Sequence, residues 1–145
     1  MLTGPLSWQD LALVTATLPN PPGATGVSWA SPEQTRIMLH SASFILTADA
    51  NVANRYVVIA AYHGGTRFSE CPAPGPQVAS EAITYRAAPC ILGIDESADQ
   101  QRMWFPITEH LILEWNHRLA ITAYNLQAGD LFTSIVIRYY QAKPR

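Results

Sequence analysis

The chain has 145 residues and a formal net charge of -2; 48% of its residues are hydrophobic and only 14% are charged. A chain of this length can bury one core without metals or disulfides, and its 4 Trp, 6 Tyr and 4 Phe argue against intrinsic disorder. The charge balance lacks the basic surface of nucleic-acid-binding domains, and no apolar run approaches the roughly 18 residues of a membrane span. We therefore expect one domain over residues 1–145 with neither nucleic acid nor membrane as a partner. An N-terminal arm is expected over about residues 1–10 and a C-terminal tail over about residues 141–145.

Strands dominate the predicted secondary structure. The 11 prolines and 8 glycines interrupt the chain at short intervals and leave few windows long enough for a helix. The first predicted strand covers about residues 11–18 and ends at a proline-rich turn. Ser7 and Asp10 stand at the spacing of a helix capping box, so a short N-terminal helix is the alternative for this region.

One long strand or two collinear strands are predicted over residues 35–47, which are rich in Ile, Leu, Phe and small polar residues. Asp49 and Asn51 follow it as turn residues, because their side chains can bond nearby backbone amides. The face of this strand that we expect to be buried carries Met38, Ala42, Phe44 and Leu46.

The centre of the chain predicts a β-hairpin. Asn54 marks the entry to a strand over residues 54–63, and residues 66–71 are expected to pair back on it. Gly64 and Gly65 between them form a two-residue turn, because glycine readily adopts the positive φ that such turns need.

Four further segments follow the hairpin. The proline-rich residues 71–76 predict a crossover loop, and residues 78–87 predict the strand after it. The most polar run, residues 95–101, predicts a solvated surface loop, and residues 103–107 predict a strand.

The last third of the chain predicts a second hairpin. Its strands cover residues 117–125 and 131–140, and Gly129 permits the sharp turn between them. The buried face of the last strand is expected to carry Leu131, Ile135, Ile137 and Tyr139.

About eight strands at short spacing indicate an all-β fold, a two-sheet antiparallel β-sandwich. We favour a jelly roll over an immunoglobulin-like domain, because no Trp lies between Cys71 and Cys90. Two cysteines are too few for a disulfide framework, and we expect them to be reduced; one bridge between them is the alternative.

Catalytic and metal-binding patterns are weak in this sequence. The histidines have no spacing that builds a metal site, no serine stands in a nucleophile elbow, and no glycine-rich phosphate loop precedes a helix. We therefore expect a protein that is not an enzyme and has no cofactor. The histidines are His40, His63, His110 and His117.

The strand after Arg55 is apolar on both of its faces, whereas a sandwich strand with one solvated face would alternate with polar residues. The protein's own loops or a neighbouring subunit must cover its second face. Low overall charge favours the subunit, because interface cores are depleted of charged residues. Tyr56, Val58 and Tyr62 are the candidate interface residues on this strand.

Trp104 and Trp115 are further candidates for a subunit or partner interface. Their alternative role is a sugar-binding platform, since exposed indole rings present flat apolar faces to pyranose rings.

Several of these segments resemble small virion proteins of tailed bacteriophages. The resemblance rests on residues 46–55, the apolar strand that ends in Gly64 and Gly65, the Pro-Ala-Pro sequence at 72–74, and residues 125–130. It implies a jelly-roll sandwich that decorates or cements a capsid or sits at the tail, and it implies no catalytic residue.

The resulting functional hypothesis is a virion structural protein, made in the host cytoplasm, that binds the major capsid protein and stabilises the shell. It would associate with itself, as a trimer at local symmetry axes. A tail, neck or fibre-adaptor protein is the first alternative. A carbohydrate-binding module for host glycans is the alternative of another class.

Overall fold

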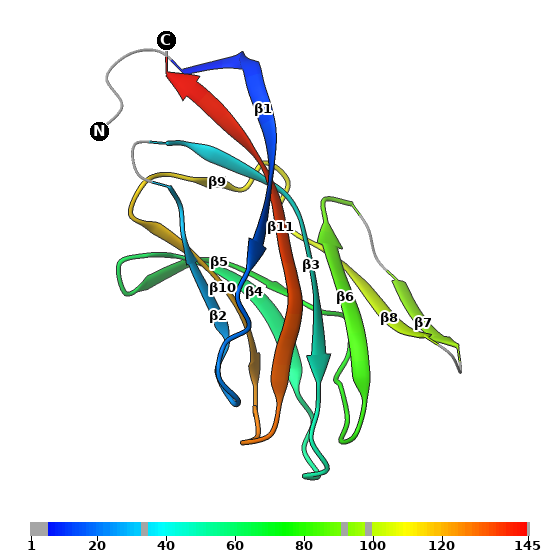
Figure 1. Cartoon of the computed structure of the whole chain (residues 1–145). Helices are drawn as coiled ribbons and strands as arrows, with labels where there is room; N and C mark the ends of the chain where they lie inside the picture. The colour runs from blue at the N-terminus through cyan, green and yellow to red at the C-terminus, as the bar shows by residue number, and fades with distance from the viewer. Residues whose placement is uncertain (1–5, 33–34, 91–92, 98–99, 145) are drawn as a thin grey trace.

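Pairing between strands organises the chain into two β-sheets (Figure 1). The computed structural model describes residues 6–32, 35–90, 93–97 and 100–144. The strands of this described part are β1 (Leu6–Leu18), β2 (Val27–Ala30), β3 (Ile37–Thr47), β4 (Tyr56–His63), β5 (Thr66–Pro72), β6 (Ala82–Ala88), β7 (Gly93–Ser97), β8 (Gln100–Pro106), β9 (Ile112–Leu113), β10 (His117–Tyr124) and β11 (Leu131–Pro144).

The strand order is that of a jelly roll. Sheet A has the order β1-β11-β3-β6-β8-β7, with β9 added beside β3, and sheet B has the order β2-β10-β4-β5. The antiparallel pairs β1 with β11, β2 with β10, β3 with β6 and β4 with β5 are nested one inside the next. Successive pairs fall in alternate sheets, as when one long hairpin wraps around a sandwich. The predicted β-sandwich of about eight strands is therefore confirmed.

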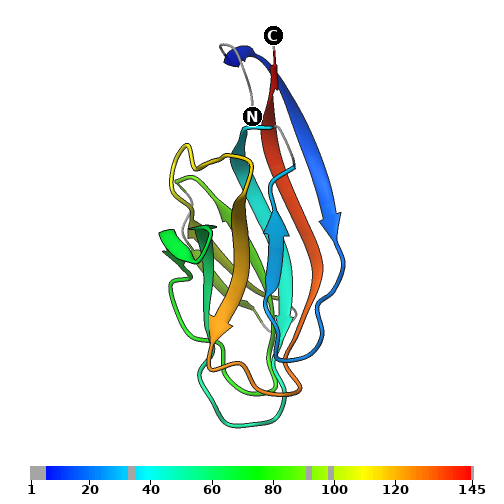
Figure 2. The same cartoon turned by 90° about the vertical axis from the view of Figure 1, so that its left-hand side faces the viewer.

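Three further strands are inserted into this eight-stranded plan. β7, β8 and β9 lie between β6 and β10 in sequence, and β8 extends sheet A by pairing parallel to β6. The remaining strand pairs in both sheets are antiparallel. Figure 2 shows the two layers from the side.

The core fills the space between the sheets. Phe44 of β3 lies at its centre, with ring centroids 5.3 Å from Tyr85 and 5.8 Å from Phe132. Leu119 and Ile121 of β10 enter the same cluster from sheet B. Full burial of each such side chain is worth about 1.5–3 kcal/mol, so these contacts hold the sheets together.

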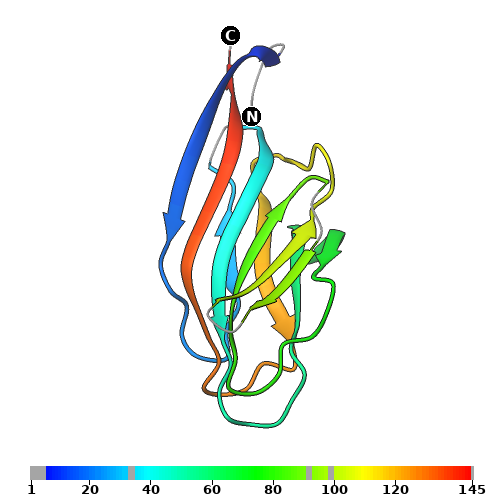
Figure 3. The ribbon, with the colours of Figure 1, turned by 90° about the vertical axis from the view of Figure 1, so that its right-hand side faces the viewer.

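The region that allowed an N-terminal helix is a strand. Ser7 pairs with Lys143 and Leu6 with Pro144, so residues expected in an arm and a tail form one two-stranded ribbon. Figure 3 shows this end of β1 and β11 reaching beyond the rest of the sandwich. Ladder hydrogen bonds to β11 on both sides of an irregularity between Ser7 and Ala12 take the place of the predicted helix. Residues 1–5 and 145 lie outside the described part.

Two β-bulges change which side chains face the core. The register of β3 against β11 shifts at His40, so the buried residues before it are Ile37 and Leu39, and the prediction that Met38 faces the core is wrong. In β11 the shift lies between Thr133 and Val136. It leaves Leu131 exposed and buries Phe132, so the prediction for Leu131 is also wrong. A bulge adds one residue to one strand and reverses the alternation beyond it.

The polar run at residues 95–101 is largely a β-hairpin and not a loop. Asp95 pairs with Arg102 and Glu96 with Gln101, so the run contributes to β7 and β8; residues 98–99 lie outside the described part. β7 is the edge of sheet A. Charged residues are common on edge strands, where they discourage pairing with other chains, so polarity did not distinguish this strand from a loop.

Candidate functional site

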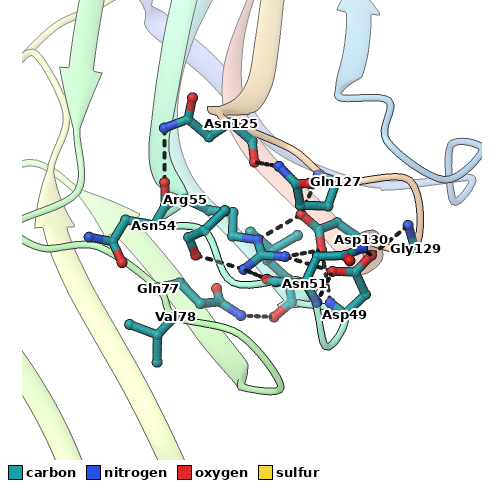
Figure 4. A network of polar contacts seen from close by, with 12 residues as sticks. Asp49, Asn51, Asn54, Arg55, Gln77, Val78, Asn125, Gln127, Gly129 and Asp130 are labelled. Carbon is teal, nitrogen blue, oxygen red and sulfur yellow. Dashed lines mark hydrogen bonds and ion pairs between the residues drawn. The ribbon is translucent and has the colours of Figure 1, made fainter.

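A buried ion-pair network joins the loops at one end of the sandwich (Figure 4). Arg55, whose side chain is 0% exposed, lies just before β4 and points toward the loop that precedes β11. Its Nε and Nη2 donate to the two carboxylate oxygens of Asp130, at 2.9 and 3.0 Å. Nη2 also donates to Asp49, and Nη1 donates to the carbonyl oxygens of Asn51 and Ala53. The donor capacity of this buried guanidinium is therefore filled by protein acceptors.

Asp130, the more buried of the two acidic partners, also accepts hydrogen bonds from the backbone. Asp130 also accepts from the backbone N–H of Gln127 and of Asp49, each at 2.8 Å. Burial by itself would raise the pKa of Asp130, but the hydrogen bonds from Arg55 and from these two amides outweigh it and lower the pKa. The hydrogen bonds between Arg55 and Asp130 have the opposite effect on the base: they raise the pKa of Arg55. Both groups stay charged at neutral pH.

Gln77 extends the network to a third loop, the β5–β6 crossover. Its backbone pairs with that of Arg55, and its amide donates to the carbonyl oxygens of Leu46 and Glu81. The amide oxygen accepts from the hydroxyl of Tyr85, whose pKa is raised by burial. Loops β3–β4, β5–β6 and β10–β11 are thereby fixed to one another.

The predicted turn residues divide between the two ends of the sandwich. Asp49, Asn51 and Gly129 belong to the ion-pair network: Asp49 accepts from the backbone amides of Asn51 and Gly129, both at 3.0 Å. Asn54 lies beside it and accepts, through its carbonyl oxygen, a hydrogen bond from the side chain of Asn125. We assign this network a structural role, because protein groups occupy its donors and acceptors.

Gly64 and Gly65 form the turn of the β4–β5 hairpin. Gly64 has a φ of 59°, the left-handed conformation that glycine adopts without steric cost.

The outer face of sheet B carries the predicted interface residues of β4. Val58 is only 1% exposed and Ala60 is equally buried, although both point away from the core. Longer side chains from β4, β5 and β10 surround them. We call this surface the Tyr–Arg face; it consists of Tyr56, Tyr62, Arg67, Glu70, Arg118 and Tyr124.

Polar contacts order the Tyr–Arg face. Arg67 donates to the hydroxyls of Tyr62, at 2.8 and 3.1 Å, and of Tyr124, at 2.9 Å. Arg118 lies over the ring of Tyr62, with its guanidinium carbon 4.5 Å from the ring centroid. Tyr124 donates in turn to Glu70. The apolar second face of β4 is thus covered in part by the same chain, through side chains of the neighbouring strands β5 and β10 and not through the loops that the sequence suggested.

The two candidate tryptophans lie elsewhere. Trp115 is 47% exposed in the turn before β10, and Trp104 lies on β8 in the other sheet. The five predicted interface residues therefore do not form one continuous surface, and the two tryptophans do not form one platform.

A hollow of about 530 Å³ lies on the outer face of sheet A. Its floor is made of small residues, and the large side chains at its sides are Arg86, Trp104, Val136 and Arg138. The strand register places Val136, Ser43, Arg86 and Trp104 in one row across four strands, with Arg138 and Ser41 in the next row. The remaining lining residues are Ala42, Ala87 and Ala88.

Only Trp104 of this hollow was a candidate from the sequence. Arg86 and Arg138 carry a signal that was overlooked: each is a charged residue between two buried residues of a strand. That pattern places the arginine on the outer face, but it cannot show that strands far apart in sequence bring the two arginines together.

The histidines and cysteines do not add a metal centre. The rings of His63 and His117 contact each other across β4 and β10 in a tilted arrangement, with centroids 5.0 Å apart. Burial and the charge of His63 lower the pKa of His117. Cys71 is buried and Cys90 is exposed, and the structure leaves both unbridged. Within the described residues, no group of three or more potential ligands is placed to hold a metal ion, and no helix is long and apolar enough to cross a membrane.

Comparison with protein-family models, with curated proteins and with solved structures found no match for this chain. The resemblance to phage virion proteins therefore stays a prediction.

Proposed function

We propose that the protein is a non-enzymatic structural component of a bacteriophage virion, a cement or decoration protein that binds the major capsid protein. The jelly-roll strand order supports this proposal at the level of fold, since viral capsid domains often use it. Lectins and enzymes use the same architecture, so the surface must carry the rest of the argument.

The Tyr–Arg face is the observation that carries the proposal. Tyr and Arg are enriched where protein interfaces gain most of their binding energy. Here their side chains are already ordered by hydrogen bonds to one another, which reduces the conformational entropy lost on association. The face also contains both signs of charge, in Arg67, Arg118 and Glu70, so a second copy can offer complementary groups.

Mass action would then stabilise the shell. A protein that binds only the assembled state stabilises it by about 2.7 kcal/mol per site at a concentration one hundred times its Kd. Self-association, with a trimer matching local threefold positions, would add avidity over several sites.

Size-exclusion chromatography with light scattering tests the association step, with Tyr62→Asp as the variant and Leu13→Asp as the control, because Leu13 is exposed on β1 in the other sheet. We expect the wild type and the control to have the mass of an oligomer and Tyr62→Asp to have the mass of one chain. A wild type that stays monomeric at high concentration would contradict self-association. Val58→Asp is unsuitable here, because it would place a charge in a buried position within the single chain.

A tail, neck or fibre-adaptor protein is the second candidate, since the same sandwich and face would serve in a ring. The number of copies in each virion separates the two candidates, because a cement protein covers the shell and a tail component occurs at one vertex.

A further inference from the structure

We propose that the hollow on the outer face of sheet A binds a carboxylated saccharide of one or two rings, with Arg138 and Arg86 binding the carboxylate and Trp104 stacking on a ring. This site lies on the opposite sheet from the Tyr–Arg face, so it is a second surface of the molecule. The proposal stands whether or not the protein belongs to a virion.

The dimensions of the hollow favour a small ligand. Its volume of about 530 Å³ falls within the range of roughly 300–1,000 Å³ typical of small-molecule sites. Ser41 and Ser43 of β3 form part of the floor, while Trp104 on one side and Val136 and Arg138 on the other form walls. One inorganic anion would leave most of this space empty.

The charge of the site favours an acidic ligand. Arg138 makes no ion pair with any described side chain, whereas Arg36, Arg55 and Arg67 each have a carboxylate partner. Arg86 approaches the serine floor from the other side, two strands away from Arg138. A guanidinium presents two parallel N–H donors that match a carboxylate, and both arginines line the hollow in which the carboxylate would bind.

The other groups favour a sugar over a peptide. The hydroxyls of Ser41 and Ser43 can both donate to and accept from sugar hydroxyls, and the half-buried indole of Trp104 offers an apolar surface to a pyranose ring. A peptide strand that binds a sheet uses an unpaired edge. β11, β3, β6 and β8 all have partners on both sides, so the strands that line the hollow offer no such edge.

NMR titration of the full chain tests the proposal, with glucuronic acid and N-acetylneuraminic acid as the acidic sugars. Glucose is the neutral control, and a short glutamate peptide and inorganic phosphate are the competing acidic ligands. We expect saturable shifts confined to the hollow with at least one acidic sugar, and at least tenfold weaker binding of glucose. Comparing the two acidic sugars shows whether the site binds the carboxylate of glucuronic acid, that of N-acetylneuraminic acid, or both.

Variants locate the binding site. Arg138→Gln changes an exposed side chain and should weaken acidic-sugar binding about tenfold or more, because charge-assisted hydrogen bonds are lost. Arg36→Gln is the matched control, because Arg36 pairs with Glu114 outside the hollow, and it should bind like the wild type. Trp104→Ala should abolish binding, whereas Trp115→Ala should not. If Trp104→Ala does not fold, the comparison of the two arginine variants still decides the question.

Three outcomes would overturn the proposal: no saturable binding of either acidic sugar in the millimolar range, equal binding of glucose, or binding of the peptide or phosphate alone. Equal loss of affinity in Arg138→Gln and Arg36→Gln would also overturn it. None of these outcomes bears on self-association through the Tyr–Arg face, which light scattering measures separately.

Discussion

Arg55 is the residue on which the loop end of the sandwich depends. A buried charge is costly unless its partners are present, and Arg55 has Asp130 and Asp49 as ionic partners together with two carbonyl oxygens. Its effect on the free energy of unfolding becomes visible as a loss of stability when one partner is removed. The pair itself can be close to neutral relative to a well-packed apolar substitute.

Arg55→Met should therefore lower the free energy of unfolding by about 3–5 kcal/mol, because Asp130 would be left buried without its cation. Arg67→Met removes an exposed ion pair and should cost about 1 kcal/mol or less. Urea unfolding of both variants measures the difference. Equal and small losses would show that the buried network does not hold the loops.

The network also predicts a response to acid. The pKa of Asp130 lies below 3.8, the value of a free carboxyl, so between the two values the unfolded chain binds more protons than the folded one. The stability that Asp130 contributes is therefore complete above about 3.8 and is lost as the pH falls through its folded pKa. The difference in unfolding free energy between wild type and Asp130→Asn should be constant near neutral pH and shrink in acid. A difference that grows in acid would contradict this sign.

The β4–β5 hairpin is the element whose sequence signal is most local. Gly64→Ala should destabilise the protein by about 1 kcal/mol, because Gly64 has a left-handed backbone that a Cβ disfavours. Gly65→Ala is the matched control: Gly65 lacks that conformation and has open space around it, so little change is expected. Thermal unfolding compares them, and equal midpoints for the two variants would contradict a turn-specific effect.

Elements defined by nearby residues could be predicted from the sequence, while those defined by distant partners could not. The hairpin at Gly64, the apolar strand after Arg55 and the sandwich itself follow from turn residues and alternation. The predictions that Met38 and Leu131 face the core were wrong. The bulges responsible depend on the pairing between β3 and β11, which are far apart in sequence. The polar run at residues 95–101 forms strands because β7 pairs with β8 at the edge of sheet A, which composition does not reveal.

The candidate sites show the same limit. The sequence identified Asp49 as a turn residue and placed Arg55 directly before the apolar strand. Asp130, however, lies 75 positions from Arg55, and only the fold makes it the partner. Arg86, Trp104 and Arg138 likewise line one hollow because the strands that carry them, β6, β8 and β11, belong to the same sheet. Side-chain placement on a strand can be inferred locally, whereas the neighbours across strands require the topology.

At the scale of the whole molecule, the jelly roll presents two outer faces of different chemistry. The Tyr–Arg face of sheet B is well suited to binding another protein, and the hollow of sheet A is suited to a small acidic ligand. The buried network fixes three loops at one end of the sandwich to one another. The hydrogen bonds within the Tyr–Arg face reduce the conformational entropy that it would lose on binding a partner.

Quantitative mass spectrometry of particles purified from the cells that encode this chain tests the proposed function most directly. The account predicts that the chain remains in the particles after washing, in a fixed ratio to the major capsid protein that reflects coverage of the shell. A ratio of only a few copies in each particle would assign it to the tail or neck. Absence of the chain from the particles would contradict the proposal that it is a virion structural protein.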